Sequence, residues 1–124
     1  MTTRLKEFRE FREKMNERIL GEKHLGIQRF FTLDTQAYQT GALPAKTKEL
    51  LGLTASMALR CDDCIAYHLI RCREEGCSRA ELFDAFDVAL VVVGSIVTPH
   101  LRRAVALLDE LDETAPEAQG GGER

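Results

Sequence analysis

Residues 45–75 read AKTKELLGLTASMALRCDDCIAYHLIRCREE, and this stretch decides how the chain is interpreted. Its first part, Ala45 to Leu59, is rich in Leu, Ala, Met, Lys and Glu, which are good helix formers. Its last part, Ile65 to Glu75, is followed by Gly76, which we expect to end a second helix. The segment Cys61-Asp-Asp-Cys64 stands between them and holds the residues with the most distinctive chemistry.

The N-terminal part of the chain predicts two further helices. Residues 1–22 are strongly charged, with one narrow apolar stripe at helical spacing, formed by Leu5, Phe8, Met15 and Ile19. Such a helix buries a single face, against the domain or against another subunit. Residues 24–42 are also expected to be helical, with Asp34 as a candidate N-cap and Gly41 as the end.

The C-terminal part contains two helix start signals. Ser78 and Glu81 form a capping box, in which each side chain satisfies a free backbone N–H, and the helix that it opens runs to about Val93. Thr98-Pro99 has the form of an N-cap followed by proline at the first helical position, for a last helix ending near Leu111. No alternating apolar run of useful length predicts a strand. The expected fold is therefore all-α, with about six helices joined by short loops.

Length and composition limit the classes of protein to consider. The 124 residues suffice for one domain, and 44% hydrophobic with 30% charged residues is typical of a soluble globular protein. A net charge of −3 gives no electrostatic basis for binding nucleic acid or an anionic membrane. The longest apolar run, around residues 88–93, is too short to span a bilayer. The N-terminal residues lack the apolar core of a signal peptide, which predicts a cytoplasmic protein.

We divide the chain into three parts. Residues 1–22 form the amphipathic helix, which we expect to contact another subunit, and residues 23–112 form the main helical domain. Residues 113–124 contain Pro116 and three consecutive glycines without apolar periodicity, so we expect a disordered tail.

The cysteine pair has the spacing of a reactive dithiol. If Cys61 begins a helix, then Cys61, Cys64 and His68 lie on one face of it. Free N–H groups and the positive end of the helix dipole favour a thiolate in the first turn, and a second cysteine can resolve a mixed disulfide. Asp62 and Asp63 act in the opposite direction, because a nearby carboxylate disfavours a thiolate.

Glu49 joins this group only if the chain turns. On one unbroken helix, twelve residues would separate Glu49 from Cys61 by roughly 18 Å. A turn near Leu59-Arg60 would instead make an antiparallel helical hairpin and bring His68 within one turn of Glu49. The predicted spatial order is then carboxylate, imidazole, thiol, thiol.

From the residues alone, three interpretations of the pair stay open: redox chemistry, metal binding and inert buried thiols. A metal site would use Cys61, Cys64 and His68, with Cys72 or Glu49 as the fourth ligand. Structural zinc sites usually combine two separated cysteine or histidine pairs, and the sequence offers no second pair.

The sequence resembles one known family at these residues. Glu49, followed by Cys61-x-x-Cys64-x-x-x-His68, is similar to the signature of the AhpD-like branch of the carboxymuconolactone decarboxylase family, and the likeness covers roughly residues 30 to 110. It implies an all-helical subunit, assembled as a homo-trimer or homo-hexamer, with a helical hairpin carrying the site. AhpD itself is longer and has two repeats, whereas this chain has room for one.

The resemblance also implies a function. Cys61 and Cys64 would be the redox pair and Glu49 and His68 a proton relay, with a hydroperoxide as substrate and a dithiol, such as a lipoyl-bearing protein, as reductant. No cofactor is expected. The alternatives are a metal-binding or structural oligomer and a decarboxylase-like lyase acting on a lactone. We expect Cys72 to be a core residue and Cys77 incidental, and His100 is a candidate for reaching the site from a neighbouring subunit.

Overall fold

The computed structural model describes residues 3–114, and all regular elements in that range are helical. They are α1 (Arg4–Gly21), α2 (Leu25–Ala37), α3 (Ala45–Leu59), α4 (Asp62–Glu74), α5 (Arg79–Val93), the short 3-10 helix η1 (Ser95–Val97) and α6 (Thr98–Thr114). The prediction of an all-α fold with about six helices is confirmed. Among the described residues, no helix has the length and apolar character needed to cross a membrane.

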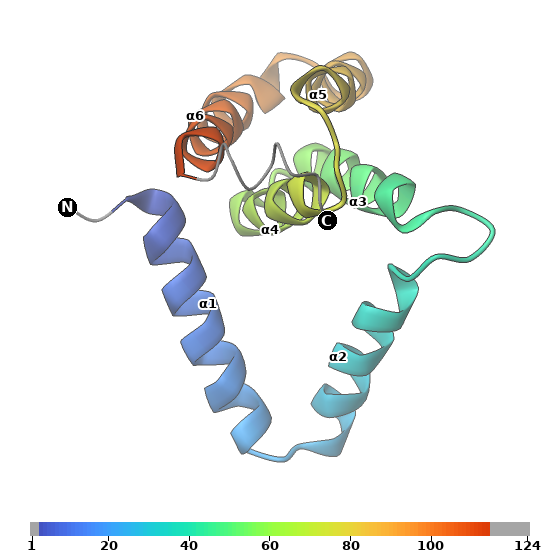
Figure 1. The fold of residues 1–124 in the computed structure, drawn as a ribbon, viewed down its shortest axis with the longest axis vertical. Coiled ribbons are helices and arrows are strands. Elements are labelled where there is room, and N and C mark those ends of the chain that lie inside the picture. Colours follow the sequence, from blue (N-terminus) through green and yellow to red (C-terminus); the bar gives the residue numbers. More distant parts are fainter. Residues whose placement is uncertain (1–2, 115–124) are drawn as a thin grey trace.

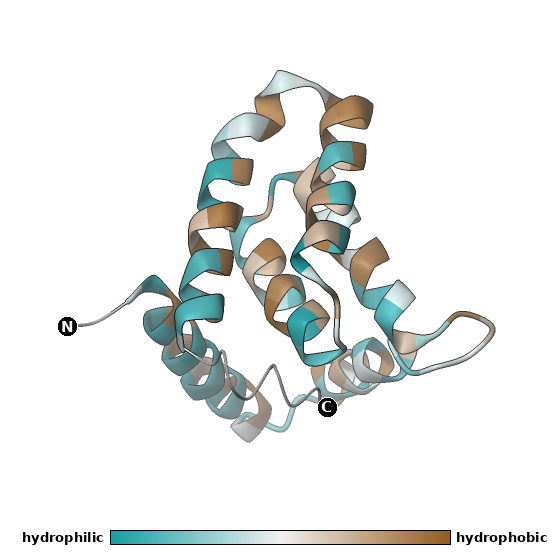
Figure 2. Ribbon diagram, turned by 45° about the horizontal axis from the view of Figure 1, so that its top comes forward, coloured by the Kyte–Doolittle hydropathy of each residue, from teal (hydrophilic) through white to brown (hydrophobic). Residues whose placement is uncertain are grey.

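The helices form a packed body with two projecting arms (Figure 1). Helices α3 and α4 lie side by side in the middle, α5 and α6 lie beyond them, and α1 and α2 extend from the opposite side as a V (Figure 1). Hydrophilic and hydrophobic residues alternate along the helices, as expected of amphipathic segments (Figure 2). The largest fully buried apolar side chains all come from the body: Leu53, Met57, Leu69, Leu82, Phe86, Val97, Leu107 and Leu108. The α1 arm buries only Leu5, and α2 buries no side chain.

The turn predicted at Leu59-Arg60 is present and closes the hairpin of α3 and α4. Arg60 adopts the left-handed conformation, with φ 59° and ψ 43°. Its N–H donates to the Met57 carbonyl at 3.0 Å, and the N–H of Cys61 donates to the Ser56 carbonyl at 3.1 Å. These two bonds are those of a Schellman motif, which satisfies the last carbonyls of a helix. Cys61 then caps α4, because its Sγ accepts from the Cys64 N–H at 3.3 Å. One residue therefore ends α3 and begins α4.

The other helix boundaries agree with the sequence in part. The capping box at the start of α5 is confirmed, with Ser78 and Glu81 each accepting from the other's backbone N–H. Asp34 as an N-cap is wrong: α2 begins earlier, where the His24 side chain accepts from the Ile27 N–H, so Asp34 lies inside the helix. Gly41 also lies beyond the end of α2 at Ala37.

The last helix begins at Thr98, where the sequence predicts its start, but Thr98 is not its N-cap. Thr98 is already helical, because η1 precedes it and supplies a first turn. The break between α5 and η1 falls instead at Gly94, whose φ of 99° suits glycine. Helix α6 continues to Thr114, past the expected end near Leu111, and the rest of the predicted tail lies outside the described residues.

Ion pairs and a backbone contact attach the other helices to α6. Arg73 of α4 reaches Asp112 at 2.6 Å, and Arg79 of α5 reaches Asp109 at 2.6 Å. At the start of α1, the N–H of Leu5 donates to Glu110 at 2.9 Å. These contacts hold the last turns of α6 against α4, α5 and the start of α1.

The left-handed residue at the hairpin turn gives a test of this geometry. We expect Arg60→Val to lower the free energy of unfolding by about 1–2 kcal/mol, because a β-branched side chain is strained at positive φ. Arg60→Gly should raise it by up to about 1 kcal/mol, since glycine adopts this conformation freely. Urea titration of both variants measures the change. Lys23→Gly, at the other non-glycine residue with positive φ (62°) among residues 3–114, is the matched control and should show a similar gain. A loss of stability in Arg60→Gly would contradict the assignment.

Candidate functional site

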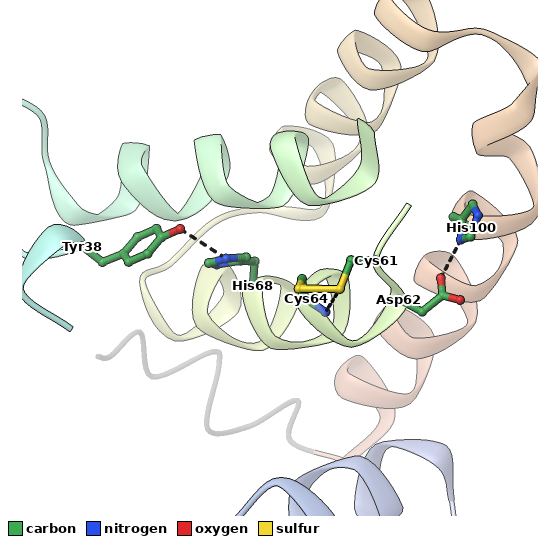
Figure 3. The surroundings of a disulfide bond; sticks show 6 residues. All are labelled: Tyr38, Cys61, Asp62, Cys64, His68 and His100. Atoms are coloured by element: carbon green, nitrogen blue, oxygen red, sulfur yellow. Dashed lines mark hydrogen bonds and ion pairs between the residues drawn. A yellow bond between two sulfur atoms is a disulfide. The ribbon is translucent and has the colours of Figure 1, made fainter. Parts of the chain in front are cut away.

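The two cysteines of the Cys-x-x-Cys segment are joined at the start of α4. Cys61 and Cys64 form a disulfide, with their Cα atoms 5.3 Å apart (Figure 3). Cys64 is exposed and Cys61 is half-buried. Cys61 Sγ also accepts the Cys64 N–H in the helix cap. A thiolate at Cys61 would keep this hydrogen bond, and the start of a helix favours negative charge.

Glu49 and His68 meet across the hairpin, as the spacing predicted. His68 Nδ1 lies 2.9 Å from Glu49 Oε1, although the residues are 19 apart in sequence. The second oxygen of Glu49 lies 3.4 Å from Arg71 Nε. Only 1% of Glu49 is exposed, and a buried carboxylate needs such partners to offset its desolvation. The hairpin therefore builds a buried carboxylate–imidazole pair with both partners of Glu49 on α4.

Tyr38 extends this pair and was missed by the sequence analysis. Its hydroxyl lies 3.3 Å from His68 Nε2 (Figure 3). When His68 Nδ1–H donates to the Glu49 carboxylate, Nε2 is an acceptor and the Tyr38 hydroxyl donates to it. Burial, followed by the charge of Glu49, raises the pKa of Tyr38, so the hydroxyl keeps its proton near neutral pH. Glu49, His68 and Tyr38 form a continuous hydrogen-bonded chain, which we call the relay.

Tyr38 is positioned by a neighbour of Glu49. It follows the last residue of α2, and Lys48 Nζ donates to the carbonyls of Ala37 at 2.9 Å and Gln39 at 2.7 Å, on either side of it. Lys48 and Glu49 therefore fix the two ends of the relay from adjacent positions on α3. A tyrosine in a connecting segment gives no periodic signal, so only the geometry identifies it.

Gly52 is a second residue that the sequence analysis missed. A Cβ added there would lie 2.7 Å from His68 Cε1 and 2.8 Å from the Tyr38 hydroxyl. Real Cβ atoms do not approach other atoms so closely. The hydrogen bond between Tyr38 and His68 crosses α3 at the one point where that helix has no side chain.

A cavity of about 680 Å³ is lined by Cys64 and by His68 of the relay. Cys64, Tyr67 and His68 line it from α4, and helices α1, α2 and α6 contribute the other walls. Its apolar wall residues include Phe8, Phe11, Met15 and Phe30. The Arg12 guanidinium lies 4.1 Å from the centre of the Tyr67 ring, which gives the cavity a cationic group. The exposed half-cystine Cys64 and the buried His68 imidazole therefore face one mostly apolar space.

The remaining candidate residues lie outside the relay. Cys72 and Cys77 are both buried free thiols, and hydrogen bonding to Cys77, together with burial, raises the pKa of Cys72. His100 reaches Asp62 of its own chain, with Nδ1 2.8 Å from Oδ1. Within residues 3–114, no three His, Cys, Asp or Glu side chains are grouped as metal ligands.

Substitution of Gly52 tests the assembly of the relay. We expect Gly52→Ala to lower the free energy of unfolding by about 1–3 kcal/mol, because the methyl group must displace His68 or Tyr38. The His68 ring resonances in an NMR spectrum should shift as the hydrogen bond to Tyr38 is lost. Gly21→Ala is the matched control: a Cβ there meets no atom within 4 Å, so stability should stay equal or rise by up to about 1 kcal/mol. Unchanged His68 resonances in Gly52→Ala would refute the close approach.

Comparisons with known proteins place this geometry in a family. A model of the carboxymuconolactone decarboxylase family matches residues 27–110. An uncharacterised protein encoded in the cox locus of Paracoccus denitrificans is 30% identical over 83 residues, covering 67% of this chain and 75% of that protein. An uncharacterised protein of Cupriavidus necator is 28% identical over 76 residues, covering 61% of this chain and 67% of that protein.

Two crystal structures of the Thermotoga maritima protein TM1620 are similar over most of their length. One has a TM-score of 0.84 and 58% identity, covering 87% of this chain and 95% of that one. The other has a TM-score of 0.85 and 54% identity, covering 91% and 96%, and is described as a carboxymuconolactone decarboxylase family protein with a possible involvement in the antioxidative response. The family match, over more than half of the chain, and the shared fold give the same result: this chain belongs to the carboxymuconolactone decarboxylase family.

Proposed function

We propose that this chain is a thiol-dependent oxidoreductase of the AhpD-like kind, which reduces hydroperoxides with Cys61 and Cys64. The observation that carries the proposal is the shared cavity, onto which the exposed Cys64 and His68 of the buried relay both open. A thiol that attacks a peroxide needs a nearby group to protonate the departing oxygen. The description of the Thermotoga maritima structure, which mentions the antioxidative response, supports the same class of function.

The exposure of the two cysteine residues favours Cys64 as the attacking residue. Cys64 is exposed and lines the cavity with His68, whereas Cys61 is half-buried and occupied in the cap of α4. In the proposed reaction, the Cys64 thiolate bonds to one peroxide oxygen and the O–O bond breaks. The departing alkoxide takes a proton from the relay and leaves as an alcohol, and Cys64 becomes a sulfenic acid.

Cys61 completes the cycle. Its thiolate attacks Cys64 Sγ, the sulfenic oxygen leaves as water after taking a proton, and the disulfide seen in the structure forms. The two electrons that reduce the peroxide thus come from the two thiols. A dithiol reductant, for which a lipoyl group is our candidate, returns them by attacking the exposed Cys64 and displacing Cys61 as a thiolate. Tyr38, His68 and Glu49 hold and move the protons in both directions.

Variants of the pair and the relay test this function. Cys64→Ser should abolish peroxide turnover, because the nucleophile is lost. Cys61→Ser should stop after one turnover, with a sulfenic acid on Cys64 that reacts with dimedone. His68→Gln should lower the rate by about 100-fold, the usual contribution of general acid–base catalysis. A coupled assay with dihydrolipoamide as reductant measures these rates.

Two outcomes would contradict the proposal. Cys77→Ala is the control, since its thiol lies outside the cavity, and it should keep full activity. Full peroxide turnover in both Cys61→Ser and Cys64→Ser would exclude the dithiol mechanism. Lactone decarboxylation unaffected by Cys61→Ser would instead support the lyase alternative.

We also propose that the chain assembles as a homo-trimer or homo-hexamer through its two arms. Their apolar residues are exposed in the single chain, with Phe11 at 66%, Phe30 at 65% and Leu33 at 63%. Arms that bury so little of their own surface gain stability when a second copy covers these residues.

Light scattering at micromolar concentration tests the assembly. The unmodified chain should be an oligomer, and Phe30→Glu should shift it towards the monomer, because a charge would be buried in the interface. Val91→Glu is the matched control on α5, where the side chain is 79% exposed and lies outside the arms. A monomeric parent chain, or dissociation by Val91→Glu alone, would overturn this assignment.

A further inference from the structure

A second carboxylate–imidazole pair lies on the other side of the disulfide from the relay (Figure 3). Asp62, the residue after Cys61, points away from the disulfide towards α6, where Oδ1 lies 2.8 Å from His100 Nδ1 (Figure 3). Its other oxygen, Oδ2, lies 3.5 Å from Arg103 Nη1. His100 and Arg103 are one turn apart on α6, so that helix presents two nitrogen groups to one carboxylate. The relay uses none of these residues.

The position of Asp62 creates an electrostatic conflict. Cys61 Sγ accepts the Cys64 N–H at the start of α4, an arrangement that stabilises a thiolate. An uncompensated carboxylate on the adjacent residue would oppose that charge. Asp63 is exposed to solvent, which screens its charge, whereas the Asp62 side chain is only 36% exposed. The Asp62 carboxylate therefore disfavours a thiolate at Cys61 more strongly than the Asp63 carboxylate does. His100 and Arg103 are the groups that face the Asp62 carboxylate.

We propose that His100 and Arg103 are positioning residues for the redox pair, which compensate Asp62 and thereby stabilise the Cys61 thiolate. Neither residue needs to touch a sulfur atom, because both act through Asp62. When a thiolate reductant bonds to Cys64 Sγ, the S–S bond breaks and its electron pair stays on Cys61 Sγ. The new charge forms on the residue that precedes Asp62, so compensating that carboxylate favours the reduced state. This inference rests on the redox pair of the proposed function but not on the identity of the oxidant.

A double-mutant cycle on the full chain tests the coupling. The variants are His100→Ala, Asp62→Asn and the two together, and the probe is iodoacetamide on the reduced protein at neutral pH, with the modified cysteine identified by peptide mass spectrometry. We expect His100→Ala to slow alkylation of Cys61 by about three- to tenfold, because Asp62 loses its closest partner. In the Asp62→Asn background, the same substitution should have no further effect, because no charge is left to compensate.

A second measurement gives the thermodynamic side of the same effect. Equilibration with mixtures of reduced and oxidised glutathione yields the fraction of the Cys61–Cys64 disulfide. His100→Ala should shift this equilibrium towards the disulfide, because the reduced state holds the destabilised thiolate. Arg103→Gln should give a smaller shift, which salt reduces, because its side chain is 54% exposed. Arg102→Gln is the matched control on the same helix, exposed and without a contact to Asp62, and should change neither quantity.

The outcomes are decisive in either direction. An equal effect of His100→Ala with and without the Asp62 charge would show a merely structural role and overturn the proposal. So would an unchanged alkylation rate and disulfide equilibrium in both His100→Ala and Arg103→Gln. If His100→Ala does not fold, Arg103→Gln, at an exposed position, carries the same cycle with Asp62→Asn. Neither measurement contains a peroxide, so the coupling can be confirmed or refuted even if the chain proves to have no peroxidase activity.

Discussion

The hydrogen bond between the Glu49 carboxylate and the His68 imidazole is the constraint on which the rest of the site depends. A carboxylate that is 1% exposed tolerates few arrangements, and losing one partner of such a pair typically costs about 3–5 kcal/mol. Both partners of Glu49, His68 and Arg71, lie on α4, so the pairing fixes how far α4 can slide along α3. The pairing also requires glycine at position 52, because His68 can reach Tyr38 only past a position without a side chain. The same contacts therefore arrange the side chains of the site and set how α3 packs against α4.

The position of the cysteine pair is set by the turn between α3 and α4. Cys61 closes α3 through its backbone and caps α4 through its sulfur, so the turn of the hairpin lies in the Cys-x-x-Cys segment itself. Two carboxylate–imidazole pairs flank this turn, one built between α3 and α4 and the other between α4 and α6 (Figure 3). The two acidic residues of the Cys-Asp-Asp-Cys segment therefore differ: Asp62 is held by α6, whereas Asp63 is exposed and lines the cavity with Cys64. The sequence alone presents them as equivalent.

The features that the sequence predicts correctly involve residues that lie close together in the chain. The turn at Leu59-Arg60, the helix over residues 45–59, the capping box at Ser78 and the meeting of Glu49 with His68 all follow from helical geometry over about twenty residues or fewer. The contacts that the sequence analysis missed join residues that lie far apart in the chain. Tyr38 sits in an irregular connection thirty residues from His68, and His100 meets Asp62 from thirty-eight residues away. Such contacts depend on how whole helices pack together, and the hydrophobic periodicity of the sequence does not predict that packing. Asp34 and Thr98 mislead because a good capping residue inside a helix resembles one at its start.

The compactness of the hairpin in sequence has a consequence for folding. Glu49, the two cysteines and His68 come from one stretch of twenty residues, and the turn that joins its two helices is short. Closing so small a loop has a low entropic cost, and proteins rich in such local contacts fold fast. The carboxylate, the imidazole and both cysteines therefore come together through short loops, at a low entropic cost. The contact between His100 of α6 and Asp62 joins residues that are 38 apart in sequence, so it closes a longer loop at a higher entropic cost.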